Sequence, residues 1–278
     1  MLLFMPELPE VQTTVNGLQL LINKEITNIE LYSRKLRYKI PKKLIKISKN
    51  TKILKIFRIA KYILLNLDNN YTIVIHLGMS GRLRVLDIQN YIPLKHDHVL
   101  FTIENNILLF NDPRKFGLID FVKEENIYLS KYFFKLGLDP LDKNFTYSYF
   151  KPKINKSKTS IKQILLNQHI VSGIGNIYAC EILFDAKISP FIEACKLNNN
   201  QIIKLMSSCK KILNKAIRSG GSSLKDYKSA DGTLGNFQKN FKVYNKQDQN
   251  ILGHKIRRKI QNGRSTFYCP GLQKKTSC

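Results

Sequence analysis

The spacing of apolar residues changes once along the chain, and this change limits the fold more than any other feature. Over residues 26–122 the apolar residues fall in short β-rich runs separated by turn residues such as Asp68–Asn70. Beyond residue 160 they recur at the three- and four-residue intervals of amphipathic helices. The expected strands include 62–67, 72–76, 99–103 and 107–110, and the expected helices are 161–168, 176–186 and 202–216. The sequence therefore predicts an antiparallel sandwich or barrel followed by a mostly helical domain.

Shorter segments complete the expected architecture. Apolar residues at helical spacing after Pro6 predict a first helix that runs to about Asn23. The irregular stretch Leu136–Ser160 is interpreted as a hinge, and the tail contains two strand-like runs, Lys242–Tyr244 and Ser265–Tyr268. We therefore expect an α+β multidomain protein with an N-terminal antiparallel β-sandwich domain over residues 5–135, a helical domain over 136–240 and a C-terminal β-hairpin region over 241–278.

The charge balance indicates a polyanionic partner. The chain has 46 Lys and Arg residues against 20 Asp and Glu, a formal net charge of +26, and 43% of its residues are hydrophobic, which excludes a disordered basic tail. Phosphates that bind Lys and Arg release counterions, so nucleic acid is the leading candidate. Coding bias towards lysine is the alternative explanation of the charge, and an anionic membrane is less favoured. No run approaches the ~20 apolar residues that cross a bilayer, so we expect a cytoplasmic protein without a membrane partner. With nucleic acid as its partner we expect it to be nucleoid-associated, and we expect a monomer.

The cysteines argue against two kinds of stabilisation. There are five of them, an odd and scattered set: Cys180, Cys195, Cys209, Cys269 and Cys278. This set allows neither a disulfide framework nor a complete four-cysteine zinc site, and it fits a reducing compartment.

Five short motifs carry specific chemical signals. In chain order they are PELPEV (6–11), HLGMSGRL (76–83), NDPRKFG (111–117), SGIGNIY (172–178) and GRSTFYC (263–269). Each alone has an ordinary structural explanation; a proline and acidic residues, for example, are common at the start of a helix. Together and in this order, the motifs resemble the formamidopyrimidine-DNA glycosylase family of base-excision repair. The resemblance covers nearly the whole chain from Met5 onward.

The resemblance implies both a fold and an activity. Members of the family have an N-terminal β-sandwich flanked by helices, a helical domain with a helix-two-turn-helix motif, and a C-terminal β-hairpin finger. The implied enzyme is a bifunctional glycosylase and lyase. It would remove oxidised purines, such as 8-oxoguanine and formamidopyrimidines, from double-stranded DNA and cleave the abasic site by β,δ-elimination.

The resemblance also assigns catalytic residues. The nucleophile is the secondary amine of the N-terminal proline, which can condense with the sugar only to a cationic iminium, an electron sink that promotes elimination. In this sequence that residue is Pro6 after removal of Met5. Glu7 is implied as the general acid/base at the sugar, and Lys61 as an assistant near the phosphate and the Schiff base. The complete expected catalytic set is Pro6, Glu7, Glu10, Lys61 and Arg264.

A second set of residues is implied in DNA binding. The target nucleotide must be extruded from the stack, and Met79, Arg114 and Phe116 match the family's gap-filling residues. The other expected contacts are His76, Lys162 and Asn176, which with Arg264 form a phosphate clamp, then His96 and Lys115, and finally Ser222 and Ser223 in the loop that caps an everted 8-oxoguanine.

The finger departs from the family pattern. The four cysteine positions of the family's zinc site fall on Gln249, Leu252, Cys269 and Leu272, so three of the four ligands are absent. We therefore expect no cofactor and a zincless finger held by apolar contacts from Val243, Ile251, Ile256 and Phe267. The alternative is a decayed finger, which predicts weak DNA binding.

The leading residues are a second departure. With residues 1–4 present, Pro6 would be an internal amide without nucleophilicity. Our hypothesis is that translation begins at Met5, which is then removed. Two other functions stay open, namely a catalytically inactive DNA-binding homologue and an endonuclease VIII-like enzyme for oxidised pyrimidines. The Pro-Glu-Leu-Pro-Glu start and the Arg-Lys-Phe triplet resemble the purine-specific branch more closely.

Overall fold

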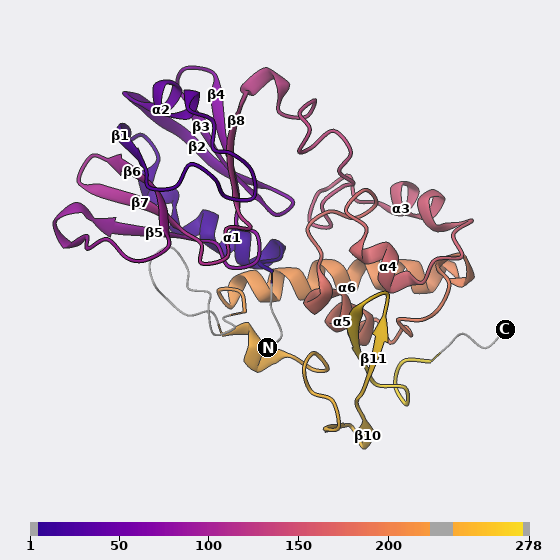
Figure 1. Cartoon of the computed structure of the whole chain (residues 1–278). Helices are drawn as coiled ribbons and strands as arrows, with labels where there is room; N and C mark the ends of the chain where they lie inside the picture. Colours follow the sequence, from indigo (N-terminus) through magenta and orange to yellow (C-terminus); the bar gives the residue numbers. More distant parts are fainter. Residues whose placement is uncertain (1–4, 223–235, 275–278) are drawn as a thin grey trace. The chain divides into compact units, whose positions relative to one another are not determined.

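The computed structural model describes residues 5–222 and 236–274, which divide into two compact units (Figure 1). The first contains residues 1–134 and 219–238, and the second contains residues 135–218 and 239–278. This division differs from the sequence-based boundaries, which place residues 219–238 with the helices. The reason is local: Ser222 is hydrogen-bonded to Glu10 near the start of the first unit.

The start of the first helix, α1 (Leu8–Gly17), is capped by side chains at its own N-terminus. Glu7 and Glu10 form a capping box, and Pro9 lies in the first turn, where its missing N–H removes no helical hydrogen bond. The helix ends earlier than the predicted Asn23, which itself has a left-handed backbone with φ 67°. A short 3-10 turn, η1 (Gln19–Leu21), follows α1 instead.

The rest of the first unit is antiparallel β-structure. Its strands are β1 (Glu25–Leu31), β2 (Thr51–Ile59), β3 (Tyr62–Leu67), β4 (Tyr71–His76), β5 (Arg82–Asp87), β6 (Asp97–Ile103), β7 (Asn106–Asn111) and β8 (Leu118–Lys123), in the order β5-β7-β6-β1-β2-β3-β4-β8. The short helical elements of this unit are α2 (Lys43–Ser48), η2 (Ile88–Asn90) and η3 (Glu124–Asn126). The predicted strands are confirmed.

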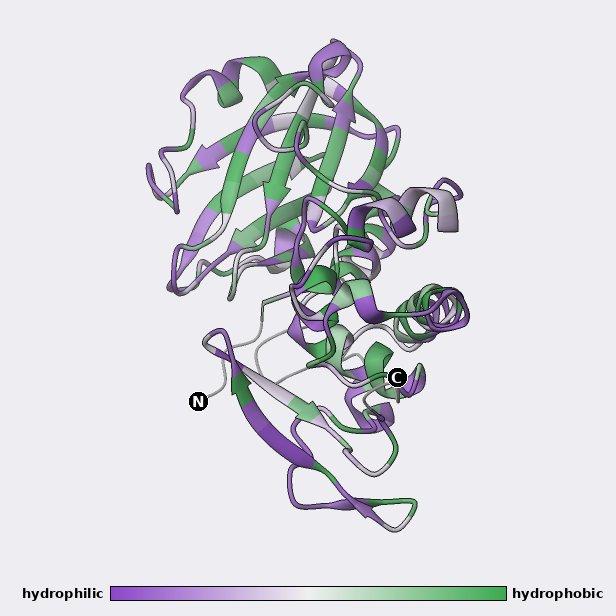
Figure 2. Ribbon diagram, turned by 90° about the vertical axis from the view of Figure 1, so that its right-hand side faces the viewer, coloured by the Kyte–Doolittle hydropathy of each residue, from purple (hydrophilic) through white to green (hydrophobic). Residues whose placement is uncertain are grey.

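The sheet folds over at the junction of β1 and β2. Only Glu25↔Lys52 and Ile26↔Thr51 pair across this junction, so the two four-stranded halves can turn towards one another. One apolar core contains residues of both halves, for example Phe101 and Ile63, together with Val11 of α1. Hydrophobic residues run along these strands in Figure 2. The predicted antiparallel sandwich is therefore confirmed.

The second unit is helical. Its helices are α3 (Tyr147–Ile154), α4 (Ile161–Leu166), α5 (Asn176–Asp185), η4 (Ala194–Lys196) and α6 (Asn199–Arg218). Helix α3 lies in the stretch 136–160 that the sequence analysis described as irregular, so that description is wrong for residues 147–154, while the interpretation of the stretch as a hinge stays a prediction. Thr146 caps the helix by accepting a hydrogen bond from the Tyr149 N–H, and buried Phe150 and Ile154 anchor it. No helix in the part of the chain that the structure describes is long and apolar enough to cross a membrane.

The finger consists of two short hairpins. They are formed by β9 (Asn250–Ile251) with β10 (His254–Lys255), and by β11 (Arg257–Gln261) with β12 (Arg264–Tyr268); η5 (Phe237–Asn240) precedes them. Gln261 pairs with Arg264 across the two-residue turn Asn262-Gly263, a sequence that is typical of tight hairpins. The strand predicted over Ser265–Tyr268 is confirmed.

The strand predicted over Lys242–Tyr244 is wrong, because a side chain replaces the partner strand. The buried Glu181 carboxylate accepts three backbone N–H bonds, from Lys242 (2.8 Å), Val243 (3.0 Å) and Tyr244 (2.8 Å). Glu181 lies on α5 among apolar residues that are themselves buried. The carboxylate thus satisfies the amides that a strand would have paired and fixes the chain that leads into the finger.

Glu181→Ala is expected to lower the free energy of unfolding by about 3 kcal/mol, because several buried amides lose their acceptor. Urea unfolding followed by circular dichroism measures this change. The matched control is Glu125→Ala, since the Glu125 side chain is 71% exposed and forms a surface ion pair with Lys123. Equal effects of the two substitutions would show that the three hydrogen bonds do not stabilise the protein.

Candidate active site

The start of α1 is a buried polar site. Glu7 and Glu10 are each 3% exposed, and Pro6 is buried beside them. Glu10 Oε2 accepts a hydrogen bond from the Glu7 N–H at 3.0 Å, and the Glu7 side chain accepts one from the backbone of Glu10. The two reciprocal bonds fix the peptide that follows Pro6, and so they fix the direction of the proline ring.

The other oxygen of Glu10 holds a segment that is distant in sequence. Oε1 accepts hydrogen bonds from the Ser222 N–H and from Ser222 Oγ, both at 2.8 Å. Gly221 has φ +73°, and a Cβ there would lie 3.3 Å from Glu10, so the close approach favours glycine. The structure thus brings together Glu10 and Ser222, two of the predicted site residues. Ser223 lies outside the described residues.

Lys61 lies in the tight turn between β2 and β3. Lys61 is only 6% exposed. Arg58 donates hydrogen bonds to the Ala60 carbonyl (2.8 Å) and to Gln12 Oε1 on α1 (2.9 Å). This guanidinium therefore fixes the turn that carries Lys61 against the helix that carries Glu10.

Asp112 organises the loop that carries Arg114 and Phe116. It is fully buried, and its Oδ2 accepts the Gly117 N–H at 2.7 Å. Its Oδ1 accepts a hydrogen bond from Ser80 Oγ at 2.5 Å, in the loop that carries Met79, and one from the Arg114 N–H at 3.2 Å. One carboxylate thus connects the two loops that sequence analysis expected to fill the gap in the DNA.

The two loops also touch through their backbones. Gly78 has φ +64°, and a Cβ there would lie 2.5 Å from the backbone of Phe116. Phe116 is 41% exposed, and the Arg114 guanidinium lies over its ring at 4.5 Å. Arg114 Nη1 is buried without a hydrogen-bond partner among the described residues. Met79 is half-buried beside Gly78.

Two further expected contacts of this unit, Lys115 and His96, lie in or beside the same loop. Lys115 is exposed and donates to Ser33 Oγ at 3.0 Å. His96 is half-buried, and its carbonyl accepts the Asp112 N–H at 3.0 Å. The sequence analysis assigned no role to His98, which is buried and whose Nε2 lies 2.8 Å from the Asp112 carbonyl oxygen.

One ring nitrogen of His76 accepts a backbone hydrogen bond, and the ring is neutral. Its Nδ1 accepts the Gly78 N–H at 2.9 Å. Burial, together with the positive charges of Lys61 and Arg37, lowers the pKa of His76 to about 4. The imidazole is therefore neutral near pH 7, with its proton on Nε2, where it can donate a hydrogen bond.

In the second unit, Lys162 and Asn176 support the finger. Lys162 is 1% exposed, and its ammonium donates to Thr266 Oγ1 (2.8 Å) and to the Ser265 carbonyl (3.2 Å). Asn176 Nδ2 donates to the same carbonyl at 2.9 Å. A buried ammonium needs acceptors, and Lys162 finds them in β12. The expected phosphate clamp stays a prediction. Arg264, at the start of β12, is exposed.

The positions of the family's zinc site do not fit zinc. Leu252 is 80% exposed, Gln249 is exposed and Leu272 is half-buried, and neither leucine has a ligand atom. Cys269 is buried, with its Sγ 3.8 Å from the His254 carbonyl oxygen. Within the described residues, no group of three His, Cys, Asp or Glu side chains could hold a metal ion.

Other contacts hold the finger at these positions. Gln273, which the sequence analysis did not single out, accepts the Cys269 N–H at 2.7 Å and donates to the Ile188 carbonyl at 2.9 Å. The expected apolar contacts are buried at Val243, Ile256 and Phe267, whereas Ile251 is only half-buried. The ring of Tyr244 packs against that of Phe267, with centroids 4.9 Å apart.

Comparison with known proteins places this arrangement in a family. Residues 5–119 match the formamidopyrimidine-DNA glycosylase N-terminal domain, and residues 136–228 match the H2TH domain of that family. The formamidopyrimidine-DNA glycosylase of Zymomonas mobilis subsp. mobilis is 42% identical over 273 residues, covering 97% of this chain and 100% of the relative. That of Rickettsia bellii is 42% identical over 275 residues, with the same coverage. The chain belongs to the formamidopyrimidine-DNA glycosylase family.

Solved structures of this family share the fold. Lactococcus lactis Fpg with DNA that contains an abasic site has a TM-score of 0.89 at 33% identity, covering 97% of this chain and 100% of that chain. The wild-type L. lactis protein with DNA that contains an oxidised pyrimidine gives the same values, and a mutant with Fapy-dG DNA has a TM-score of 0.90. The expected family and fold class are confirmed, and the chain is an enzyme of the DNA glycosylase class that acts in DNA repair.

Asp112→Asn is expected to loosen the loop that carries Arg114 and Phe116. Both carboxylate oxygens of Asp112 accept hydrogen bonds, whereas an amide has only one oxygen that can accept them. We expect exchange of the Gly117 amide hydrogen to become at least about tenfold faster, a loss of roughly 1.4 kcal/mol of protection. Hydrogen exchange followed by NMR measures it. The Val243 amide, which is bound to Glu181 in the second unit, is the internal control. Unchanged exchange at Gly117 would contradict the role of Asp112.

The depressed pKa of His76 predicts a stability change on acidification. The unfolded chain takes up a proton at this side chain near its ordinary pKa of 6.5, whereas the folded chain does so only near 4. The free energy of unfolding should therefore fall as the pH is lowered through this window. Urea unfolding at several pH values should show a shallower fall for His76→Gln than for the wild type. Parallel curves would contradict the burial of a neutral imidazole.

Proposed function

We propose that this DNA glycosylase removes oxidised purines from double-stranded DNA and cleaves the resulting abasic site by β,δ-elimination. The observation that carries the proposal is the buried start of α1, where Glu10 fixes both the peptide after Pro6 and the loop segment at Ser222. Complexes of L. lactis Fpg with Fapy-dG DNA and with abasic-site DNA support the substrate class.

The chemistry begins at Pro6 once the preceding residues are removed. The amine nitrogen forms a bond to C1′ of the damaged nucleotide while the N-glycosidic bond breaks, and the base leaves with the electron pair and gains a proton. Glu7 donates a proton to the sugar ring oxygen, the ring opens and a cationic iminium results. Loss of a C2′ proton then expels the 3′ phosphate, and loss of a C4′ proton expels the 5′ phosphate.

The other buried groups act on this intermediate in different ways. Lys61 places a positive charge beside the site, where it stabilises phosphate oxygens and assists proton transfer at the Schiff base. Glu10 is a positioning residue, because its hydrogen bonds to Glu7 and Ser222 occupy both of its oxygens. Ser222 and Ser223 would then begin the loop that covers an everted purine.

Extrusion of the nucleotide requires side chains that replace it in the stack. Phe116 is exposed and Met79 lies on the neighbouring loop, so both can enter between base pairs. The buried Nη1 of Arg114 is a donor that can bind the unpaired partner base. The shared Asp112 carboxylate makes the two loops enter as one unit.

The second unit supplies phosphate contacts through the finger. Arg264 is the exposed cation of β12, and Lys162 and Asn176 position it by holding the Ser265 carbonyl. In this proposal the finger works without zinc, since Glu181 and Gln273 hold its two ends. His96 and Lys115 add DNA contacts beside the gap-filling loop.

Trapping with borohydride tests the proposal directly, because borohydride reduces an iminium to a stable amine. A chain that begins at Met5, and from which Met5 is then removed, is expected to cross-link to an 8-oxoguanine:C duplex. The Pro6→Gly variant replaces the secondary ring amine with a primary amine and so tests the need for the ring. The matched control is the chain that retains residues 1–4, which should bind the duplex without cross-linking. Binding without a cross-link by the Met5-start chain would favour a catalytically inactive homologue.

One observation favours a second substrate. The wild-type L. lactis protein has been solved with DNA that contains an oxidised pyrimidine. The same trapping assay with a thymine glycol duplex distinguishes the two classes. Faster cross-linking to thymine glycol than to 8-oxoguanine would identify an endonuclease VIII-like preference.

A further inference from the structure

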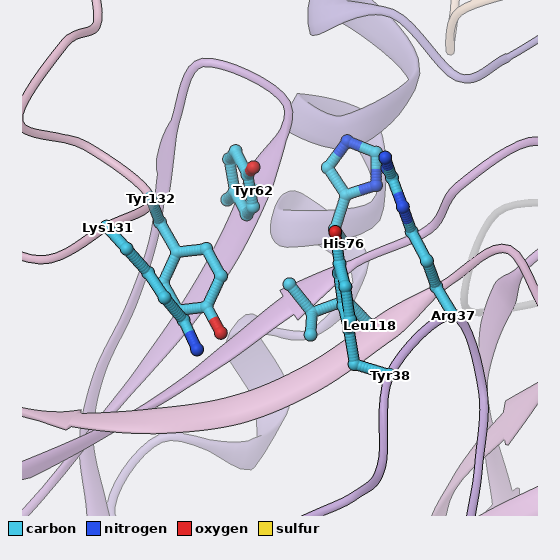
Figure 3. Close-up of a pocket in the computed structure, with 7 residues that line it drawn as sticks. All are labelled: Arg37, Tyr38, Tyr62, His76, Leu118, Lys131 and Tyr132. Carbon is cyan, nitrogen blue, oxygen red and sulfur yellow. The ribbon is translucent and has the colours of Figure 1, made fainter.

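The first unit contains a pocket that the proposed chemistry does not use. It is a cavity of about 360 Å³ lined by Arg37, Tyr38, Tyr62, His76, Leu118, Lys131 and Tyr132 (Figure 3). Of these residues only His76 belongs to the predicted site. In Figure 3, Lys131, Tyr132 and Tyr62 lie on one side and Arg37 and His76 on the other, with Leu118 between them.

One side of the pocket is an ordered aromatic wall. The Tyr62 ring lies 4.7 Å from the His76 ring, 5.9 Å from Tyr132 and 5.1 Å from Phe133, measured between centroids. Tyr62 is therefore fixed by three neighbouring rings. The rings are tilted against one another by 48° to 80°, so together they form a rigid aromatic side of the pocket rather than one flat face.

Asp120 fixes the outer part of this wall. Its carboxylate accepts a hydrogen bond from the Tyr132 hydroxyl and lies 3.4 Å from the Lys131 ammonium. Lys131 also lies 5.0 Å from the centre of the Tyr132 ring. Burial and the nearby Asp120 raise the pKa of Tyr132, so its phenol stays protonated and remains bound to the carboxylate.

The part of the pocket around Arg37 and His76, which adjoins the Tyr62 ring, suits an anion. The Arg37 side chain reaches towards the His76 ring in Figure 3, and Arg37 is exposed. His76 Nδ1 accepts the Gly78 N–H, so the proton of the neutral ring lies on Nε2, which can donate a hydrogen bond to a ligand. A guanidinium and an N–H donor side by side match the oxygens of a phosphate group.

We propose that this pocket binds one unpaired nucleotide, with its phosphate at Arg37 and His76 and its base against Tyr62 and Tyr132. A phosphate satisfies the cationic side, an unstacked base covers the aromatic wall, and the sugar lies over Leu118. The nucleotide can be a free mononucleotide or the last nucleotide of a DNA strand. The second source rests on the proposed function, because β,δ-elimination leaves a gap with two strand ends.

Fluorescence of 2-aminopurine tests the proposal, since this base loses emission when it stacks on a ring. The chain contains no tryptophan, so the probe can be excited where the protein does not absorb. We expect the 5′-monophosphate of 2-aminopurine deoxyriboside to be quenched by the full chain. Tyr132→Ala should weaken this binding by about tenfold or more, in the range of single base–aromatic stacks.

Three further variants separate base stacking and phosphate binding from an effect on folding. Tyr132→Phe keeps the ring and loses only the bond to Asp120, so it should retain most of the quenching. Arg37→Ala should weaken binding of the monophosphate but have little effect on the uncharged nucleoside. Lys52→Ala removes an exposed charge elsewhere in the unit and should leave both titrations unchanged.

The two sources are distinguished by a second arm, in which 2-aminopurine is the terminal nucleotide at a one-nucleotide gap in a duplex. Quenching of the free nucleotide that is lost in Tyr132→Ala supports a mononucleotide site, and quenching only at the gap supports a strand-end site. If Tyr132→Ala and Arg37→Ala change neither titration, the proposal is overturned. Neither arm requires cleavage, so this result is independent of the borohydride experiment.

Discussion

The hydrogen bonds of one carboxylate, that of Glu10, underlie the arrangement of the site. One oxygen holds the peptide between Pro6 and Glu7, and the other holds the backbone and hydroxyl of Ser222. A buried carboxylate must be fully hydrogen-bonded, so the start of α1 and the segment at Ser222 depend on each other. Chemistry at a proline amine and cover over an extruded base would then share one anchor.

The same device recurs at two other places in the molecule. Asp112 connects the loops of Met79 and Phe116, and Glu181 holds the chain that enters the finger. In each case a buried acid binds backbone amides of segments without regular structure. The chain has only 20 acidic residues against 46 basic ones. Three of the acidic residues, Glu10, Asp112 and Glu181, hold loops rather than face solvent.

Much of the fold could be predicted from the sequence, because periodicity reports burial directly. Strands β3, β4, β6 and β7 and the helices after residue 160 follow from apolar spacing. Helix α3 was missed because polar and lysine residues and Pro152 obscure its pattern, and the strand at Lys242–Tyr244 was overpredicted because Glu181 takes its hydrogen bonds. Tertiary partners of this kind leave no local signal.

The site shows the same limit. Pro6, Glu7 and Glu10 could be named from one motif, since they are adjacent in the chain. The hydrogen bond between Glu10 and Ser222 joins residues 212 positions apart, and the one from Lys162 to Thr266 of β12 joins residues 104 positions apart. A buried acid on the otherwise apolar helix α5 was the one available signal for Glu181.

The division of the chain into units has a consequence for its synthesis. The first unit is interrupted after residue 134 and is completed only by residues 219–238. On the ribosome, the sandwich therefore emerges long before the donors that Glu10 requires. Until residue 222 has left the exit tunnel, the nascent sandwich has a carboxylate without two of its partners, so water must solvate the future site. The end of the sandwich around Glu10 is thus the last part of it to be completed.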